Sequence, residues 1–261
     1  MASPLLALPA ELLVHIVEQV CDDEALRNLA LVNHQLQLLA ESILYRRLFL
    51  RREKEVRRLA HVVARDSRRC KAIQAIDARC RIHADYNMHT IIDSQFDLLG
   101  NLARQSPNLK DLTIESPFCN HDLWAYASES IWGIMVDSWM APIVESAQVT
   151  RPTFNSEQRP LRALTKLTLH LNGIEQEFWE CNHHFAAVFA LPALQELHLS
   201  SVNLPDDTID DMSSAFPDGL KTPLKHLTLD EANITLKGLR GILALPKALE
   251  YLYLGMCVSV T

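Results

Sequence analysis

The segments LTKLTL (164–169), LQELHL (194–199) and LKHLTL (224–229) share the pattern L-x-x-L-x-L. The segments LKDLTI (109–114) and LEYLYL (249–254) extend the series, and successive segments start 55, 30, 30 and 25 residues apart. Leu or Ile at alternate positions predicts short strands with one buried face. Periods of this length are typical of proteins that repeat one supersecondary unit. The second half of the chain is therefore predicted to be a repeat array.

Three of the repeats also share a sequence pattern in the residues that follow the predicted strand. An apolar residue follows ten positions after the first Leu, and an Asn stands just before it. The Asn side chain is suited to bond backbone groups left unpaired where a strand ends. Helix-compatible stretches follow at 175–191, 206–216 and 236–245, so each unit is predicted to be strand, turn and helix. The apolar residues are Ile174, Leu204 and Ile234, and the Asn residues are Asn172, Asn203 and Asn233.

Residues 109–261 resemble leucine-rich repeats. The resemblance implies an α/β fold, a leucine-rich-repeat solenoid whose curved parallel sheet lines the concave side and whose helices lie outside. Residues 73–78 are a candidate first strand, so the repeat domain is assigned to 73–261. The segment near 116–160 fits the repeat poorly and is expected to be a helical insertion or a degenerate repeat. Its aromatic residues are expected in the core.

The residues between the Leu positions are predicted to face outward in rows across the strands, because side chains alternate along a strand. In a leucine-rich-repeat protein these rows would form the concave face. They are the candidate target-binding residues, although such rows equally suit an unused solvated surface. The candidates are Lys166, Thr168, His170, Glu196, His198, His226, Asp230, Tyr251 and Tyr253.

The sequence ends shortly after the last predicted strand. Leu249, Leu252 and Leu254 are therefore expected to leave an open apolar edge, covered by a partner, a second copy or further repeats.

Three short helices are predicted within the first fifty residues. Leu12, Ile16 and Val20 recur at helical spacing after Pro9. Asp22 or Asp23 is suited to cap a second helix, and a third begins near Asn33. Because helices this short cannot each bury a face alone, they should pack together, with excess Leu facing a partner.

Residues 1–50 resemble an F-box. The resemblance is carried by LPAEL (8–12), Ile16, Val20, LRNLALVN (26–33) and Leu44-Tyr45. The late Trp of the family is absent, and Tyr45 or Phe49 stands near its place. An F-box implies docking to the Skp-family adaptor of cullin–RING ubiquitin ligases; the alternative is a helical cap on the repeat array. The adaptor-binding candidates are Leu8, Pro9, Leu12, Ile16, Val20, Leu26, Leu29 and Val32.

The charge is unevenly distributed. Residues 46–81 hold 13 Lys/Arg against four acids, in a chain whose net charge is -7. Apolar residues recur at helical spacing within residues 51–70, so residues 51–72 are predicted to be an amphipathic basic linker helix. A nucleic-acid surface is the alternative, disfavoured because aromatic residues for stacking bases are missing.

Composition and cysteine usage indicate a reduced compartment. Apolar residues make up 48% of the chain, which is ordinary globular usage. The six cysteines show no C-x-x-C spacing, and neither a basic-led signal peptide nor an 18-residue apolar run is found. A cytoplasmic or nuclear location is expected, with no membrane partner.

No catalytic motif stands out. The Cys119/His121 and Cys181/His183 pairs lie 62 residues apart, too far for a recurring zinc pattern. No cofactor, metal site or enzymatic activity is expected. The favoured interpretation is a substrate-recognition subunit of an SCF-type ubiquitin ligase, with a cullin reached through the adaptor and an unknown protein bound by the repeats. A free leucine-rich-repeat scaffold or inhibitor is the main alternative, and a nucleic-acid-associated factor is the third.

Overall fold

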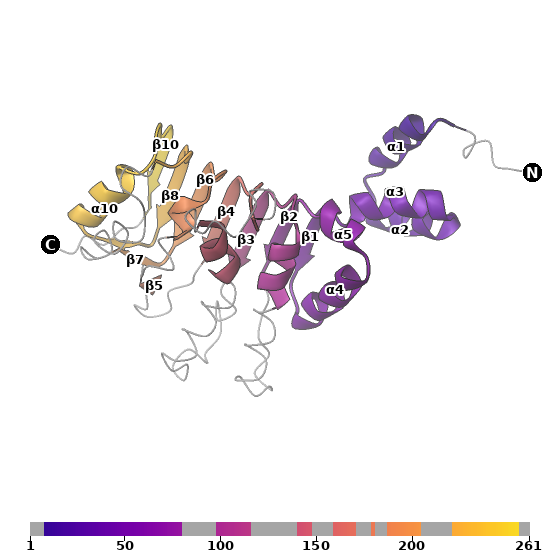
Figure 1. Ribbon diagram of the computed structural model, residues 1–261, viewed down its shortest axis with the longest axis horizontal. Helices are drawn as coiled ribbons and strands as arrows, with labels where there is room; N and C mark the ends of the chain where they lie inside the picture. Colours follow the sequence, from indigo (N-terminus) through magenta and orange to yellow (C-terminus); the bar gives the residue numbers. More distant parts are fainter. Residues whose placement is uncertain are drawn as a thin grey trace, which may run out of the picture.

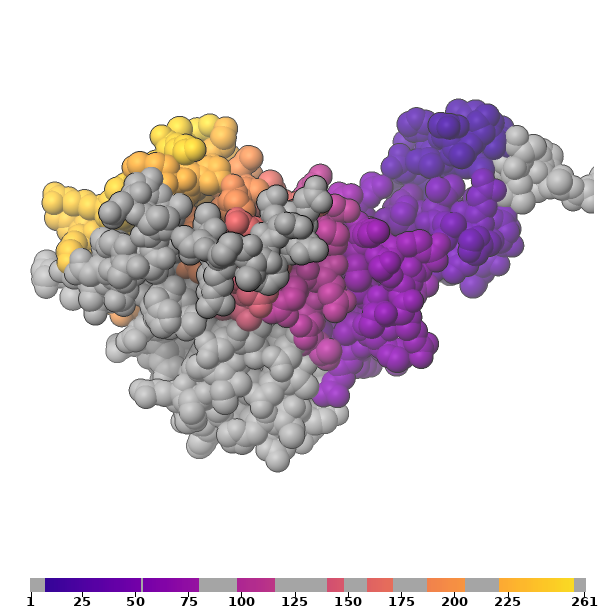
Figure 2. Space-filling view, viewed as in Figure 1, coloured from indigo at the N-terminus to yellow at the C-terminus, as the bar shows by residue number. Residues whose placement is uncertain are grey.

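A helical N-terminal region stands beyond one end of a parallel sheet (Figure 1). The space-filling view shows this region protruding from the rest of the molecule (Figure 2). Its helices are α1 (Ala10–Glu18), α2 (Asp23–Val32) and α3 (His34–Leu44). The computed structural model describes residues 8–79, 98–115, 140–147, 159–170, 179–180, 187–204 and 221–255.

Two side-chain caps start helices α2 and α3. Asp22 accepts a hydrogen bond from the Ala25 amide at 2.8 Å, and Asn33 accepts one from the Leu36 amide at 2.9 Å. Each cap satisfies an amide that the first helical turn leaves without a partner. The three predicted helices are thus confirmed, with Asp22 as the cap of the second. They share a small core of their own, made of Val17, Leu26, Leu36 and Ala40.

Seven strands form one parallel sheet in the order β1-β2-β3-β4-β6-β8-β10. The strands of this sheet therefore lie side by side in the same order as they follow one another along the chain. The architecture is therefore mixed α/β, as predicted, with a helical N-terminal region and a parallel sheet. The strands are β1 (Arg47–Leu50), β2 (Ala75–Ala78), β3 (Asp111–Glu115), β4 (Lys166–His170), β6 (Glu196–Ser200), β8 (His226–Asp230) and β10 (Tyr251–Leu254).

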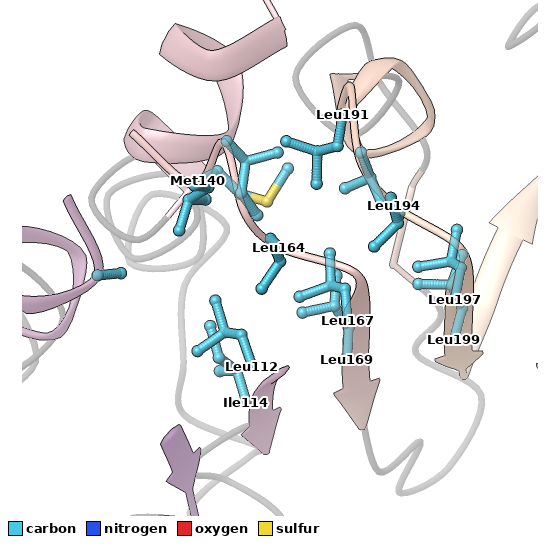
Figure 3. Packing of buried hydrophobic residues seen from close by; sticks show 14 of the residues in the cluster. Leu112, Ile114, Met140, Leu164, Leu167, Leu169, Leu191, Leu194, Leu197 and Leu199 are labelled. Atoms are coloured by element: carbon cyan, nitrogen blue, oxygen red, sulfur yellow. The ribbon is translucent and has the colours of Figure 1, made fainter. Parts of the chain in front are cut away.

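The repeated Leu and Ile residues pack behind the sheet, as the alternation predicts. Leu167, Leu197 and Leu227 stand in register on neighbouring strands, and each is at most 2% exposed. The close-up shows the side chains of adjacent repeats stacked in layers, with Met140 above them (Figure 3). Burial of each layer removes apolar area from water, which is the main stabilising contribution to such a core.

A second, three-stranded parallel sheet is formed by segments that follow strands β4, β6 and β8 in the chain. It consists of β5 (Trp179–Glu180), β7 (Val202–Leu204) and β9 (Asn233–Ile234). Ser201 and Glu231 precede β7 and β9 and have positive φ of 55° and 48°, which is left-handed backbone typical of a turn. Asn233 donates to the side-chain oxygen of Asn203 at 3.0 Å, so its side-chain amide bonds the Asn of the preceding repeat rather than the backbone as predicted.

Helical segments lie away from the strands in most repeats. Helix α10 (Leu236–Leu243) confirms the stretch predicted at 236–245, and residues 98–105 and 140–147 are helical. Within the stretch predicted as helical at 175–191, the described residues form strand β5, which contradicts the prediction, and the short 3-10 helix η4 (Ala187–Ala190). Pro192 follows directly and disfavours a continued helix. The helix predicted at 206–216 and most of segment 116–160 lie outside the described residues.

The linker at 51–72 contains two helices instead of the single one predicted. They are α4 (Glu53–Arg65) and α5 (Ser67–Ala72), separated at Asp66. Asp66 has extended backbone and its side chain accepts from the Arg68 amide at 3.0 Å, so it caps a new helix. Helix α4 is amphipathic, as expected, and it buries Val56 and Val63.

The sheet starts earlier than predicted. Strand β1 lies inside the segment 1–50 that was assigned to the helical domain, and it pairs with β2, the strand expected at 73–78. Leu48 and Leu50 alternate as in the later strands, but Tyr45 stands where the first Leu of the pattern would be, so the full pattern does not mark β1.

The last described strand is open on its outer side. Leu252 and Leu254 of β10 are 38% and 41% exposed, whereas their register partners Leu227 and Leu229 on β8 are fully buried. This exposure agrees with the apolar edge expected from the sequence.

Candidate interaction surfaces

The sheet face opposite the buried leucines, called the open face below, carries three rows of side chains. Strand register brings the predicted target-facing residues together on this face. The first row contains Asp111, Lys166, Glu196, His226 and Tyr251, and the second contains Thr113, Thr168, His198, Thr228 and Tyr253. The third contains Glu115, His170, Ser200 and Asp230.

Neighbouring polar side chains of the first row contact one another across the strands. The Lys166 ammonium lies 3.3 Å from a Glu196 carboxylate oxygen, and His226 Nδ1 lies 3.8 Å from the other one. The His226 ring meets the Tyr251 ring edge-on, with centroids 6.0 Å apart. At the entrance to the strand, the Lys225 ammonium bonds Glu250 at 2.7 Å, and this bond lowers the pKa of that carboxyl. Since these charges are about half exposed, they shape the surface more than they stabilise the fold.

The second and third rows are more sheltered. Burial lowers the pKa of His198, and the nearby His170 lowers it further, so His198 is neutral at neutral pH. In the third row, the Ser200 hydroxyl and His170 Nδ1 lie 2.9 Å apart. This part of the open face therefore offers hydroxyl and imidazole groups, together with the carboxylates of Glu115 and Asp230 in the third row.

Asp111 is a half-buried carboxylate of which one oxygen is buried without a hydrogen bond. Burial raises its pKa, opposed by the neighbouring Lys166 and Arg47, and its buried Oδ1 has no hydrogen-bond partner. A buried carboxylate oxygen without a hydrogen bond lowers the stability of the fold. A partner that donates a hydrogen bond to Asp111 could therefore stabilise this group.

The first two strands extend the open face with residues that sequence reasoning missed. Phe49 of β1 is 57% exposed, and the Arg51 guanidinium carbon lies 6.0 Å from its ring centroid. Asp77 of β2 pairs with Arg51 at 3.2 Å and with Arg79 at 2.8 Å, and Arg79 also approaches Glu115 at 3.7 Å. Recognition of β1 as a strand would have placed Phe49 on the sheet, whereas Asp77 lies in the strand expected at 73–78.

The helical N-terminal region exposes apolar side chains that its own core does not use. On α1, Leu12 and Ile16 are 48% and 44% exposed, while Leu13 and Val17 of the same helix are buried. At the end of α2, Leu31 and Val32 are 84% and 65% exposed. Large apolar residues left in water on so small a unit are typical of a protein-interaction surface.

The predicted adaptor-binding residues fall into three groups, which are exposed, half-buried and buried. Those that the structure exposes are Pro9, Leu12, Ile16 and Val32. Leu26 is 2% exposed and belongs to the small helical core, so its prediction as a surface residue is wrong. Val20 and Leu29 are half-buried against that core and Leu8 is half-buried. Val14 and Leu31 are exposed but were not predicted, because a helical pattern marks apolar positions without saying which side is covered.

Comparison with known families identifies this helical region. Residues 5–51 match the F-box-like family model. F-box domains typically bind Skp-family adaptors. The match includes the three helices and β1, and no curated protein matches the chain.

An ion pair between Arg69 and Glu41, called the clamp below, joins the F-box-like region to the linker. Arg69 of α5 bonds both carboxylate oxygens of Glu41 on α3, at 2.8 and 3.1 Å, and its guanidinium carbon lies 5.5 Å from the Tyr45 ring centroid. The Arg69 bond lowers the pKa of Glu41 in spite of the partial burial of this carboxyl. A second contact joins Arg46 to Glu18 at 3.2 Å. These pairs tie helices α1 and α3 to the chain that enters the sheet.

Among the described residues, no cluster of three His, Cys, Asp or Glu side chains is arranged to hold a metal ion. In the same part of the chain, no helix is both long and apolar enough to cross a membrane. The Cys119/His121 and Cys181/His183 pairs lie outside the described residues.

Proposed function

We propose that the protein is a non-catalytic substrate receptor of an SCF-type ubiquitin ligase. The F-box-like region binds the Skp-family adaptor, and the adaptor connects it to a cullin. The parallel sheet is the inner face of a leucine-rich-repeat solenoid, whose concave side is the open face and binds the protein to be ubiquitylated. The proposed location is the cytoplasm, the nucleus or both.

The observation that carries this proposal is the F-box-like match together with the exposed apolar residues on the matched helices. Leu12 and Ile16 lie one turn apart on α1, and both are available to a partner. Interfaces commonly concentrate their binding free energy in a few such anchors.

The leucine-rich-repeat assignment is supported by the sequence and the strand order together. The repeated pattern places a Leu at the same register position of successive parallel strands. Sequential parallel strands joined by connections on one side are the arrangement that solenoid repeats produce, since each repeat contacts only its neighbours.

The mechanism is proximity. A receptor that holds a target on the same scaffold as a ubiquitin-charged enzyme raises the effective concentration of an acceptor lysine. No chemical group of the receptor needs to act on the reacting atoms.

The test is co-purification with the adaptor. The double variant Leu12→Ala, Ile16→Ala is expected to lower adaptor affinity at least tenfold, because it truncates two exposed anchors without touching the small core. Leu236→Ala is the matched control: Leu236 is 64% exposed on α10, far from the F-box-like region, and its loss should leave adaptor binding unchanged. Undiminished adaptor binding by a folded double variant would overturn the proposed docking surface.

A further inference from the structure

A small corner of the open face lies where β8 and β10 end. The corner consists of Asp230, Tyr253 and Gly255, with His198 in the neighbouring row. A Cβ atom added to Gly255 would lie 1.9 Å from Asp230 Oδ1 and 3.2 Å from Tyr253 Cε1. The Asp230 carboxylate and the edge of the Tyr253 ring therefore both border the space over Gly255, and a side chain larger than that of glycine would clash with the carboxylate.

The carboxylate in this corner differs from its neighbours on the open face. Asp77, Glu115 and Glu196 each have a basic side chain within 4.0 Å. Asp230 has no such ion pair in the part of the chain that the structure describes, and its Oδ1 accepts a hydrogen bond from the Glu231 amide at 3.1 Å. Its negative charge is thus available to a ligand.

Among the described residues of the second row, no charged basic side chain accompanies Asp230. His198 is the nearest basic group in the second row, and burial lowers its pKa so that it carries no charge at neutral pH. Tyr253 is 46% exposed beside the carboxylate and presents an aromatic surface. A carboxylate next to an exposed aromatic ring is the combination that holds a cationic side chain, through an ion pair and a cation–π contact.

We propose that this corner binds an arginine side chain of the target, with Asp230 accepting the guanidinium hydrogen bonds and Tyr253 supporting its face. Arginine is favoured over lysine because its planar guanidinium is able to bond a carboxylate and stack on a ring at the same time. The inference rests on the proposed function, since it assigns a chemical class to the segment that the open face receives. The target is then a protein with an exposed, arginine-containing segment.

The first experiment uses the full chain and small probes. Isotope-labelled protein is titrated with N-acetyl-arginine amide, N-acetyl-lysine amide and the neutral isostere N-acetyl-citrulline amide, while backbone amide shifts are followed. Arginine is expected to shift the amides of residues 251–255 and Asp230 and to bind at least tenfold more tightly than citrulline. Equal shifts with citrulline, or arginine shifts confined to other surfaces, would overturn the proposal.

Variants then identify the groups responsible. Asp230→Asn and Tyr253→Ala should each weaken arginine binding about tenfold, whereas Tyr253→Phe keeps the ring and should bind as the unmodified chain does. Glu250→Gln is the matched control, because that carboxylate is already held by Lys225 and should not contribute. Arginine binding that survives Asp230→Asn in full would show that the corner is not the site.

A final arm separates the two proposals. Lys166→Glu and Thr168→Arg alter the middle of the open face without touching the corner. If captured ubiquitylation substrates are lost in these variants but kept in Asp230→Asn, the open face binds targets and the arginine assignment is wrong. If substrates are kept in all three variants, the proposed target surface itself is wrong. Loss in both sets supports both proposals.

Discussion

Replacing Arg69 by alanine removes the clamp between the F-box-like region and the linker. The Arg69 and Glu41 side chains are only 22% and 17% exposed, and two charge-assisted hydrogen bonds join them. After the substitution, the Glu41 carboxylate keeps only the Gln37 amide, 3.0 Å away. Leaving a partly buried carboxylate short of partners costs about 1–3 kcal/mol.

Urea denaturation of Arg69→Ala, Glu41→Gln and the double variant measures this contribution as a double-mutant cycle. We expect a coupling free energy of about 1–2 kcal/mol, because residues in direct contact couple by amounts of this order. In thermal melts each kcal/mol lowers the midpoint by about 2–4 °C for a chain of this size.

The pH dependence supplies an independent check. The pKa of Glu41 is lowered in the folded protein, so the clamp stabilises the fold fully above the ordinary carboxyl value of 4.5. As the pH falls through the lowered folded pKa, Glu41 becomes protonated and this contribution is lost. Wild type and Arg69→Ala should therefore differ most near neutral pH and converge in acid. A coupling free energy near zero, or one unchanged by acid, would refute the reasoning.

Three further predictions concern the repeats. Leu197→Ala empties a fully packed core position and should cost about 2–5 kcal/mol in urea denaturation, whereas Leu236→Ala on an exposed position should cost under about 0.5 kcal/mol. Thr235→Ala removes the hydroxyl that caps α10 at Gly238 and should cost about 1 kcal/mol; an unchanged denaturation midpoint would show that the cap is unimportant. Gly238→Ala should destabilise the protein although alanine favours helices, because the added Cβ would lie 2.6 Å from the Leu204 carbonyl oxygen; a higher melting temperature would contradict this.

The strands and their register were predictable because period-two alternation is strong where one face is buried. Leu167 and Leu197 recur every thirty residues, and that pattern alone aligns the neighbouring rows. The caps at Asp22 and Asn33 were predictable for a similar reason, since a capping side chain acts on amides within its own helix turn.

What escaped prediction depended on contacts between distant parts of the chain. Strand β1 is stabilised by pairing with β2, about thirty residues later, and its own four residues carry only the last part of the repeated Leu pattern. The pairing of Asp77 with Arg51 follows from that strand. Leu26 and Leu12 have equal hydrophobicity, so only the packed structure shows that one is core and the other surface.

Strand β1 lies within residues 5–51, the segment that matches the F-box-like family, and it is also the first strand of the parallel sheet. The two parts of the chain consequently share residues and have no clean cutting point between them. A fragment that starts at residue 51 would strip the sheet of β1 and leave the backbone edge of β2 exposed to pairing with other chains. Exchange of the F-box-like region for that of another protein should preserve solubility only when the junction precedes Arg47, so that the sheet retains its own first strand.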